Sequence, residues 1–223
     1  EVSVLAVFNG EEVYPMISAK DHKKLLDNDE GPNTGGMGAV APNPLYTTLL
    51  EEDFNKHILQ PTLNGLKERK LEFAGVIFFG LMICNNQCYL LEYNMRMGDP
   101  ETQAILPLLD SDFLEMIDNA INKKPIEMQW KQMHSCSVVL ASRGYPENPE
   151  TGKLITFKNK EATNDAVTIA GGRLENNNLY NSGGRVINVT TTAVTLELAK
   201  EKTYETIHNI EFEGMYYRKD IGK

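Results

Sequence analysis

Two strand-turn-strand patterns limit the folds that this 223-residue sequence can adopt. The first joins the apolar, β-branched run Val2–Phe8 to a second extended run at residues 12–17 through Asn9-Gly10. Asn-Gly between two such runs indicates a β-hairpin, because both residues of its tight turn must accept positive φ. The second pattern covers residues 75–94, with Asn85-Asn86 at its centre. The sequence therefore predicts antiparallel strands in both places.

Three segments have the start signals and the apolar spacing of amphipathic helices. Thr48-x-x-Glu51 and Asp112-x-x-Glu115 each form a capping box, and a third helix is expected near residues 195–209. We expect Pro61 to kink the first helix, because proline lacks a backbone N–H. The residues expected to face a core are Leu50, Phe54, Ile58, Leu63 and Leu66 in the first helix, Phe113, Met116, Ile117, Ala120 and Ile121 in the second, and Leu196, Ala199, Thr203, Ile207 and Ile210 in the third.

The residue pattern of the sequence changes near Lys123, where a Lys-Lys-Pro segment leads into short strand-like runs separated by Gly, Pro and Asn clusters. These runs are residues 135–141, 154–157 and 185–189. The change predicts a first domain at residues 1–127 and a second at residues 128–223. Antiparallel strands mixed with a few helices predict an α+β fold.

Charge and cysteine content argue against several classes of protein. The chain carries 22 Lys and Arg against 31 Asp and Glu, a formal net charge of −9, and it has no basic run, which argues against binding nucleic acid or anionic membranes through charge. Three cysteines without CxxC spacing indicate reduced thiols of an intracellular protein. The longest apolar stretch, residues 74–84, is shorter than the roughly 20 residues that cross a bilayer.

The densest group of polar side chains closes an apolar strand. Because side chains alternate along a strand, we expect Glu92, Asn94 and Arg96 to share one face. Carboxylate and amide oxygens suit Mg²⁺, which usually takes its other ligands from water and substrate phosphates, while a guanidinium can hold phosphate or carboxylate. The alternative is a solvated strand face with a surface Glu-Arg pair. Position favours a site, because the strand runs directly into Gly98-Asp99-Pro100-Glu101, a turn with two more carboxylates.

Three other segments are candidate binding elements. Residues 31–38 contain four glycines, whose backbone amides could converge on an anion, but they lack the Lys-Ser/Thr of a P-loop and the spacing of a dinucleotide fingerprint. The alternative is a flexible surface loop. Residues 21–24, Asp-His-Lys-Lys, cluster ionisable groups, although such a cluster is ordinarily a solvated turn. Ser182-Gly183-Gly184-Arg185 is typical of a turn before a strand, and its arginine could also hold a phosphate.

Four motifs, in this order along the chain, resemble one family. They are Lys20-Asp21-His22-Lys23, Gly31-Pro32-Asn33-Thr34-Gly35-Gly36-Met37-Gly38, Arg96-Met97-Gly98-Asp99-Pro100-Glu101-Thr102-Gln103 and Phe212-Glu213-Gly214-Met215-Tyr216-Tyr217-Arg218-Lys219-Asp220-Ile221-Gly222. Over essentially its whole length the chain resembles the glycinamide ribonucleotide synthetases (phosphoribosylamine–glycine ligases), ATP-grasp enzymes of purine biosynthesis. The resemblance implies the C-terminal half of an ATP-grasp core, an antiparallel sheet with helices, followed by a small α+β C-terminal domain.

In that family ATP phosphorylates the carboxylate of glycine, and the amine of 5-phosphoribosylamine displaces phosphate from the glycyl phosphate to form an amide. The resemblance implies that Glu92 and Asn94 hold Mg²⁺ or Mn²⁺ and that Arg96 stabilises the acyl phosphate, with Asp99 as the second catalytic residue. It places Asp21, Asn33, Gly35 and Gly36 on the substrate side. The sequence departs from the family pattern at Met95 and Met97, where we expect cysteine and phenylalanine in packing positions.

The family's N-terminal substrate domain, the first part of the ATP-grasp core and the lid over the nucleotide phosphates precede the point where this chain starts, at Glu1. We therefore expect the chain alone to be inactive and to need the N-terminal half of the same cytoplasmic enzyme as its partner. Two alternatives remain: another ATP-grasp ligase with a different acceptor, and a non-catalytic half-domain retained as a scaffold. The glycine loop argues against the first, and the intact Glu92, Asn94, Arg96 and Asp99 argue against the second.

Overall fold

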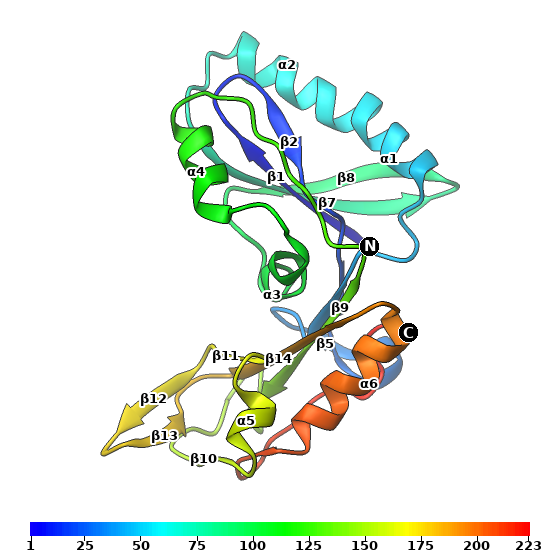
Figure 1. The fold of residues 1–223 in the computed structure, drawn as a ribbon. Coiled ribbons are helices and arrows are strands. Elements are labelled where there is room, and N and C mark those ends of the chain that lie inside the picture. The colour runs from blue at the N-terminus through cyan, green and yellow to red at the C-terminus, as the bar shows by residue number, and fades with distance from the viewer. The chain divides into compact units, whose positions relative to one another are not determined.

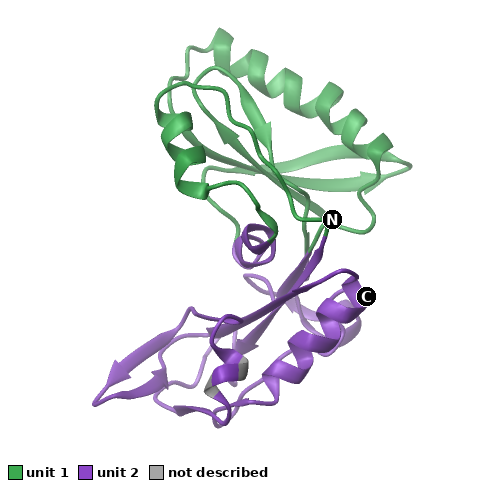
Figure 2. Ribbon diagram, viewed as in Figure 1, with its two compact units in different colours: residues 1–20, 41–98, 108–132 green, residues 21–40, 99–107, 133–223 purple. Residues whose placement is uncertain are grey.

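The computed structural model describes residues 1–223 apart from the side chains of residues 160 and 162. By its internal contacts the chain divides into two compact units, each with its own core (Figures 1 and 2). Unit 1 comprises residues 1–20, 41–98 and 108–132, and unit 2 comprises residues 21–40, 99–107 and 133–223. Neither unit is a continuous stretch of sequence. The expected domain division at 127/128 stays a prediction.

Unit 1 is built on a four-stranded antiparallel sheet with the strand order β2-β1-β7-β8. The central strands are β1 (Val2–Phe8) and β7 (Gly75–Cys84), and the edge strands are β2 (Val13–Pro15) and β8 (Gln87–Asn94). Every residue of β1 is buried, as expected for an apolar run between two neighbours. Both predicted hairpins are confirmed by the pairing of β1 with β2 and of β7 with β8.

The two hairpins close in different ways. Asn85 and Asn86 both have positive φ, 50° and 57°, so the second hairpin has the two-residue turn that the sequence predicts. In the first hairpin Gly10 has a φ of 94°, but Asn9 does not adopt positive φ. The prediction of a tight Asn-Gly turn is therefore wrong for this hairpin. Oδ1 of Asn9 instead accepts the backbone amides of Glu11 and Glu12, at 2.9 and 2.8 Å, which stabilises a wider loop.

A long helical segment packs on the unit 1 sheet (Figure 1). It consists of α1 (Thr48–Phe54), a π-helical turn (Asn55–Leu59) and α2 (Gln60–Glu68). The π turn ends two residues before Pro61, whose missing N–H makes a regular helical bond impossible there. The predicted capping box is wrong by one residue, because Thr47 is the N-cap and accepts the Leu50 amide. The predicted apolar stripe is confirmed, with its buried members being Leu50, Phe54 and Ile58.

The helix α4 (Phe113–Ile121) begins as predicted, with Oδ1 of Asp112 accepting the amides of the next turn. Met116 and Ala120 are buried, but Phe113 and Ile121 are 40% and 67% exposed. The expectation that all five apolar residues face a core is therefore wrong. At 100° per residue, Ile121 lies about 140° around the helix from Met116, so one narrow stripe cannot bury both.

Unit 2 contains a five-stranded sheet with the order β11-β14-β9-β6-β3, a four-stranded sheet with the order β12-β13-β10-β15 and the two-stranded pair β4-β5. The strands of the first sheet are β11 (Val167–Ile169), β14 (Arg185–Ala193), β9 (His134–Ala141), β6 (Gly38–Ala41) and β3 (Lys20–Asp21). The others are β12 (Gly172–Glu175), β13 (Asn178–Asn181), β10 (Leu154–Phe157), β15 (Ile210–Glu211), β4 (Lys24–Leu26) and β5 (Glu30–Asn33). The helices are α3 (Glu101–Ile105), α5 (Lys160–Thr163) and α6 (Leu196–Ile207).

The third predicted helix is confirmed as α6, which Thr195 caps by accepting the Leu198 amide. Its buried residues are Leu196, Ala199, Thr203 and Ile207, and it packs on β9 and β14. The predicted strands at residues 135–141 and 154–157 are present as β9 and β10, and the third, β14, continues to Ala193. No helix of the described chain is long and apolar enough to span a membrane.

A buried arginine ties the C-terminal motif to the β4-β5 pair. Arg218 is 1% exposed, and its guanidinium donates to both carboxylate oxygens of Asp220 at 2.8 and 2.9 Å and to Oδ1 of Asp29 at 2.9 Å. Burial opposes ionisation of Asp220, but the hydrogen bonds from Arg218 and the Asn28 amide prevail and hold the pKa of Asp220 well below its usual range. This network anchors the segment that leads into the glycine loop, residues 31–38.

Candidate functional site

The first group of site residues stands at the end of β8 in unit 1. Nδ2 of Asn94 donates to Oε1 of Glu92 at 3.1 Å, so the prediction that these two side chains share a face is confirmed. Both are accessible to solvent. The contact uses the nitrogen of Asn94, and the other two polar atoms, Oδ1 of Asn94 and Oε2 of Glu92, are oxygens of the kind that Mg²⁺ binds.

A bulge decides which side chains of β8 face which way. The register with β7 shifts between the pairs Gly80↔Glu92 and Leu81↔Leu90, which makes Leu91 an extra residue. Beyond the bulge the alternation is regular, so Tyr93 lies on the opposite face from Glu92: its ring packs edge-on against Phe79, with 5.4 Å between centroids. Its hydroxyl also lies 2.6 Å from Oγ1 of Thr62 in α2. Simple alternation along the whole strand misses this bulge.

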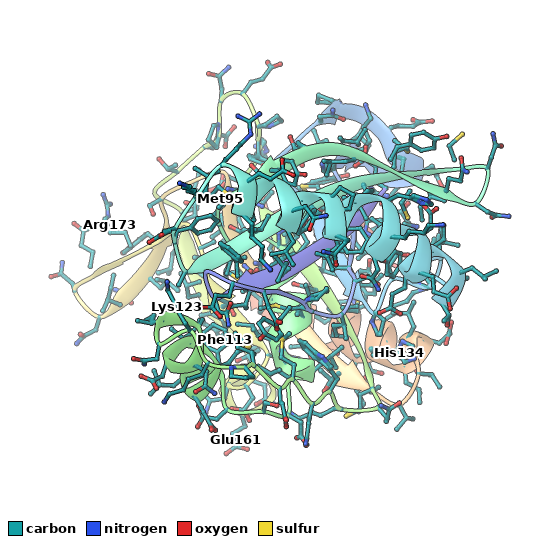
Figure 3. The ribbon with its side chains drawn as sticks, turned by 90° about the horizontal axis from the view of Figure 1, so that it is seen from above. Met95, Phe113, Lys123, His134, Glu161 and Arg173 are labelled. Carbon is teal, nitrogen blue, oxygen red and sulfur yellow. The ribbon has the colours of Figure 1, made fainter. Side chains whose placement is uncertain are left out.

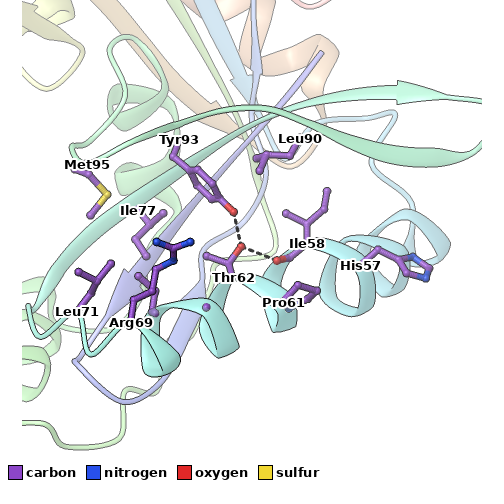
Figure 4. Close-up of a pocket in the computed structure, with 12 residues that line it drawn as sticks. His57, Ile58, Pro61, Thr62, Arg69, Leu71, Ile77, Leu90, Tyr93 and Met95 are labelled. Atoms are coloured by element: carbon purple, nitrogen blue, oxygen red, sulfur yellow. Dashed lines mark hydrogen bonds between the residues drawn. The ribbon is translucent and has the colours of Figure 1, made fainter.

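Behind this face lies an apolar pocket of about 470 Å³ within unit 1 (Figure 4). Leu90, Tyr93 and the exposed Met95 line it from the strand side, and Ile58 and Pro61 line it from the helical segment. The lining contains no carboxylate. Met95 projects from the end of the strand (Figure 3) and is 60% exposed, so the packing role expected for it is wrong in this structure.

Arg96 lies beyond the end of β8, which stops at Asn94, so strand alternation does not decide which way its side chain points. Its Nη1 donates to the carbonyl oxygen of the neighbouring Met97 at 3.0 Å. The guanidinium is exposed. The structure therefore brings two of the three residues of this constellation together through a hydrogen bond.

The second group lies in unit 2, where Arg185 joins two segments that are distant in sequence. Its Nη1 donates to the carbonyl oxygen of Gly35 at 2.7 Å and to that of Asp99 at 2.6 Å. Its Nη2 donates to Oδ2 of Asp99 at 3.1 Å. The sequence suggested Arg185 as a phosphate-binding residue, but these three bonds go to the protein.

Two glycine amides of the loop donate to side chains of the protein. The amide of Gly35 donates to the Tyr145 hydroxyl at 2.9 Å, and that of Gly36 donates to Oγ1 of Thr34 at 3.0 Å. Gly36 has a φ of +112°, and a Cβ there would lie 2.4 Å from Cδ of Pro100. The amides of Gly35 and Gly36 are thus engaged within the protein, and Gly36 permits close packing against Pro100.

The segment 21–24 is also not the solvated turn that is ordinary for such residues. His22 is buried, and its Nε2 accepts the amide of Gly222 at 3.1 Å. Oδ1 of Asp21 is buried without a hydrogen-bond partner, beside Gly36. Burial, and next the charge of the buried Glu101, raise the pKa of Asp21 well above its usual range, although the charges of Lys23 and Arg185 oppose them.

The remaining site residues differ in how they are placed. Asn33 is exposed at the end of β5, where it pairs with Lys24. Asp99 is bound by Arg185 and accepts Nε2 of Gln103 at 2.9 Å, yet its side chain is 45% exposed. Sequence reasoning missed Tyr145, because a single tyrosine in a turn carries no signal that it reaches a loop 110 residues away.

Comparison with known proteins adds a second line of evidence. Residues 1–102 match the family model described as phosphoribosylglycinamide synthetase, ATP-grasp (A) domain, and residues 135–223 match the phosphoribosylglycinamide synthetase C domain. The chain is 50% identical to a phosphoribosylamine–glycine ligase of Fusobacterium nucleatum and 47% identical to one of Clostridium acetobutylicum, with all of this chain and 53% and 54% of those proteins covered.

A solved structure gives the same result. The crystal structure of phosphoribosylamine–glycine ligase from Thermotoga maritima superposes with a TM-score of 0.91 at 34% identity, covering 99% of this chain and 55% of that one. This agreement extends over both units. The chain thus spans about half the length of the relatives it matches.

Proposed function

Because this chain belongs to the phosphoribosylglycinamide synthetase family, we propose that it forms the C-terminal part of an ATP-dependent phosphoribosylamine–glycine ligase. In the proposed reaction ATP phosphorylates the carboxylate of glycine, and the amine of 5-phosphoribosylamine attacks the glycyl phosphate. Glycinamide ribonucleotide, ADP and phosphate are the products. The enzyme would work in the cytoplasm, and the N-terminal half of the same enzyme would supply most of the residues that bind ATP.

Glu92 and Asn94 would hold Mg²⁺ or Mn²⁺ at the end of β8. Their fit rests on one exposed face, where a carboxylate orients an amide whose remaining polar atom is an oxygen. Among the side chains that the structure describes, no group of three or more His, Cys, Asp or Glu could hold a metal. A divalent cation bound there would neutralise charge on the phosphate oxygens of ATP.

Arg96 would stabilise the acyl phosphate. Its guanidinium is exposed beyond the end of the strand that carries Glu92 and Asn94, and its Nη1 donates to the carbonyl oxygen of the neighbouring Met97. An exposed planar guanidinium can form two parallel hydrogen bonds to a phosphoryl group. A lysine at this position would offer a point charge without that fork.

Asp99, Asp21, Asn33, Gly35 and Gly36 would form the substrate side. The Asp99 carboxylate remains 45% exposed while Arg185 fixes its orientation, so it can accept a hydrogen bond from an amine. Gly36 brings backbone close to Pro100, which shapes the loop. The raised pKa of Asp21 favours a neutral carboxyl, which can donate as well as accept a hydrogen bond.

The observation that carries this proposal is the shared face of Glu92 and Asn94 in a chain of this family. The test uses a chimera in which this chain replaces the matching part of the F. nucleatum relative. We expect the chimera to release ADP only when glycine and 5-phosphoribosylamine are both present, and to form the amide product. The 223-residue chain alone should release no ADP. An active isolated chain, or an inactive but folded chimera, would contradict the proposal.

A further inference from the structure

Arg185 lies at a junction of three segments of unit 2: β14, the glycine loop and the turn that precedes α3. We propose that Arg185 is a positioning residue for the ligase reaction, whose guanidinium holds the glycine loop and the Asp99 turn in one fixed arrangement. The inference rests on the proposed function, which places Gly35, Gly36 and Asp99 on the substrate side. Arg185 would act through these residues and would not itself touch the reacting atoms.

The three hydrogen bonds use the shape of the guanidinium. Nη1 bridges two carbonyl oxygens, of Gly35 and Asp99, at 2.7 and 2.6 Å, while Nη2 reaches the Asp99 carboxylate at 3.1 Å. Hydrogen bonds from a charged donor are stronger than neutral ones, and the Arg185 side chain is 22% exposed, so water competes with them only in part. The bridged residues lie 150 and 86 positions away in the sequence.

Tyr145 completes the junction from a second side. Its hydroxyl accepts the Gly35 amide at 2.9 Å, so both polar groups of the Gly35 backbone are held, the carbonyl by Arg185 and the amide by Tyr145. The two peptide groups that flank the Gly35 Cα are thus each held by one hydrogen bond, which restricts rotation about the φ and ψ of Gly35. The loop can therefore keep a fixed position although it contains four glycines.

The glycines around Arg185 are explained by this arrangement. A Cβ on Gly35 would lie 3.1 Å from Cζ of Arg185 and 3.2 Å from the Tyr145 hydroxyl. A Cβ on Gly184 would lie 2.2 Å from Cδ2 of Tyr145, which is too close for any side chain. The Gly-Gly-Arg sequence and the Gly-Gly loop thus make room for the same two side chains, which supports a built junction rather than a chance surface contact.

The test compares Arg185→Lys with Arg173→Lys in the chimera. Arg173 is a matched control, because it is an exposed arginine on β12 (Figure 3) that pairs with Glu175 at 3.1 Å. Lysine keeps the charge, but its compact ammonium lacks the planar fork whose two nitrogens reach the carbonyls and the carboxylate separately. We expect Arg185→Lys to lower kcat/KM for glycine and 5-phosphoribosylamine about 10–100-fold, since small misplacement of positioning groups has effects of this size. The KM for ATP should stay unchanged, and Arg173→Lys should match the unsubstituted chimera.

A second measurement tests the rigidity of the junction by hydrogen exchange and does not depend on enzyme activity. In the 223-residue chain, hydrogen exchange at the amides of Gly35 and Gly36 should be about tenfold faster in Arg185→Lys than in Arg173→Lys, because the loop opens more often. The two experiments separate the possible failures. An unsubstituted chimera that forms no product would refute the proposed function alone. If that chimera is active and Arg185→Lys changes neither substrate kinetics nor exchange, the positioning role is overturned.

Discussion

The carboxylate of Glu92 accepts a hydrogen bond from Nδ2 of Asn94, 3.1 Å away on one face of β8. This bond selects the orientation of the Asn94 amide, because only its nitrogen can donate to a carboxylate. The amide oxygen takes no part in this bond, so it is the polar atom of Asn94 with which the proposed cation would interact. The bulge at Leu91 and the packing of Tyr93 on the opposite face hold the strand end in this register.

Removal of the Glu92 charge should abolish most of the ligase activity. In the chimera we expect Glu92→Gln to lower kcat/KM by more than about 100-fold, beyond the 10–100-fold effects typical of residues that only orient metal ligands. The KM for Mg²⁺ should rise in parallel. Glu52→Gln, on the exposed side of α1, is the control and should leave both values unchanged. Equal kinetics for the two variants would show that Glu92 is not part of the site.

Substitution of Asp21 should raise the stability of the chain and lower the activity of the chimera. Because the folded-state pKa of Asp21 is raised above the ordinary value of 3.8, its ionisation opposes folding as the pH rises above 3.8, and this penalty is absent at lower pH. Asp21→Asn cannot ionise. We expect it to raise the free energy of unfolding of the 223-residue chain at pH 7 by on the order of 1 kcal/mol and to lower activity in the chimera.

Urea denaturation at several pH values checks this prediction. The gain from Asp21→Asn should shrink as the pH falls toward 3.8. The control is Asp118→Asn, since the Asp118 side chain is 64% exposed and its substitution should have little effect at any pH. A gain for Asp21→Asn that is the same at pH 4 and pH 8 would contradict the assignment.

The glycine loop should not tolerate a methyl group at Gly36. Alanine there would have to adopt a φ of +112° with its Cβ 2.4 Å from Pro100, so we expect Gly36→Ala to lower the free energy of unfolding by about 1–3 kcal/mol. Gly65→Ala is the matched control. Gly65 lies in α2 with open space around its Cα, and alanine should stabilise the chain there by about 0.4–1 kcal/mol. Chemical denaturation of the three proteins gives the comparison.

Arg218 should be essential for the stability of unit 2. Arg218→Met leaves the buried carboxylate of Asp220 without its charged partner, and we expect a loss of about 3–5 kcal/mol in the free energy of unfolding. Arg173→Met, at an exposed ion pair, should change it by less than about 0.5 kcal/mol. Similar losses for the two variants would show that the Arg218 network does not support unit 2.

The same network predicts a dependence on acid. The folded-state pKa of Asp220 lies below the ordinary value of 3.8, so its ionised form stabilises the native state above pH 3.8, and this contribution is lost as the pH falls through the folded-state value. The difference in unfolding free energy between the unsubstituted chain and Asp220→Asn should be constant from pH 5 upward and shrink below pH 3.8. A difference that grows in acid would have the wrong sign.

Local features of the fold could be predicted from the sequence because neighbouring residues decide them. Positive φ at Asn85 and Asn86 closes a hairpin, and Asp112 caps a helix, whatever surrounds them. The extra residue at Leu91 depends on pairing with β7, which the periodicity of the strand itself does not contain. Pro61 predicted an irregularity in the first helix but not its form, a π turn.

The same limit holds for the site: contacts between nearby residues could be predicted, and contacts between distant residues could not. Glu92 and Asn94 are two positions apart on one strand, so alternation places them together. The junction at Arg185 joins residues 150 and 86 positions apart, and its bonds to backbone carbonyls leave no pattern of matching side chains in the sequence. Its glycines were visible, but they indicated an anion nest, whereas the structure uses them for close packing.

Binding of ATP and a divalent cation tests the proposed cation site of Glu92 and Asn94 most directly, because it does not depend on the later chemical steps. The measurement is the change in Tm of the chimera on adding ATP with Mg²⁺, compared with ATP alone. A ligand that binds the native state raises Tm, so we predict a Mg²⁺-dependent rise for the unsubstituted protein and for Glu52→Ala, and none for Glu92→Ala. The same rise in Glu92→Ala, or no rise in the unsubstituted protein, would contradict a cation site at the end of β8.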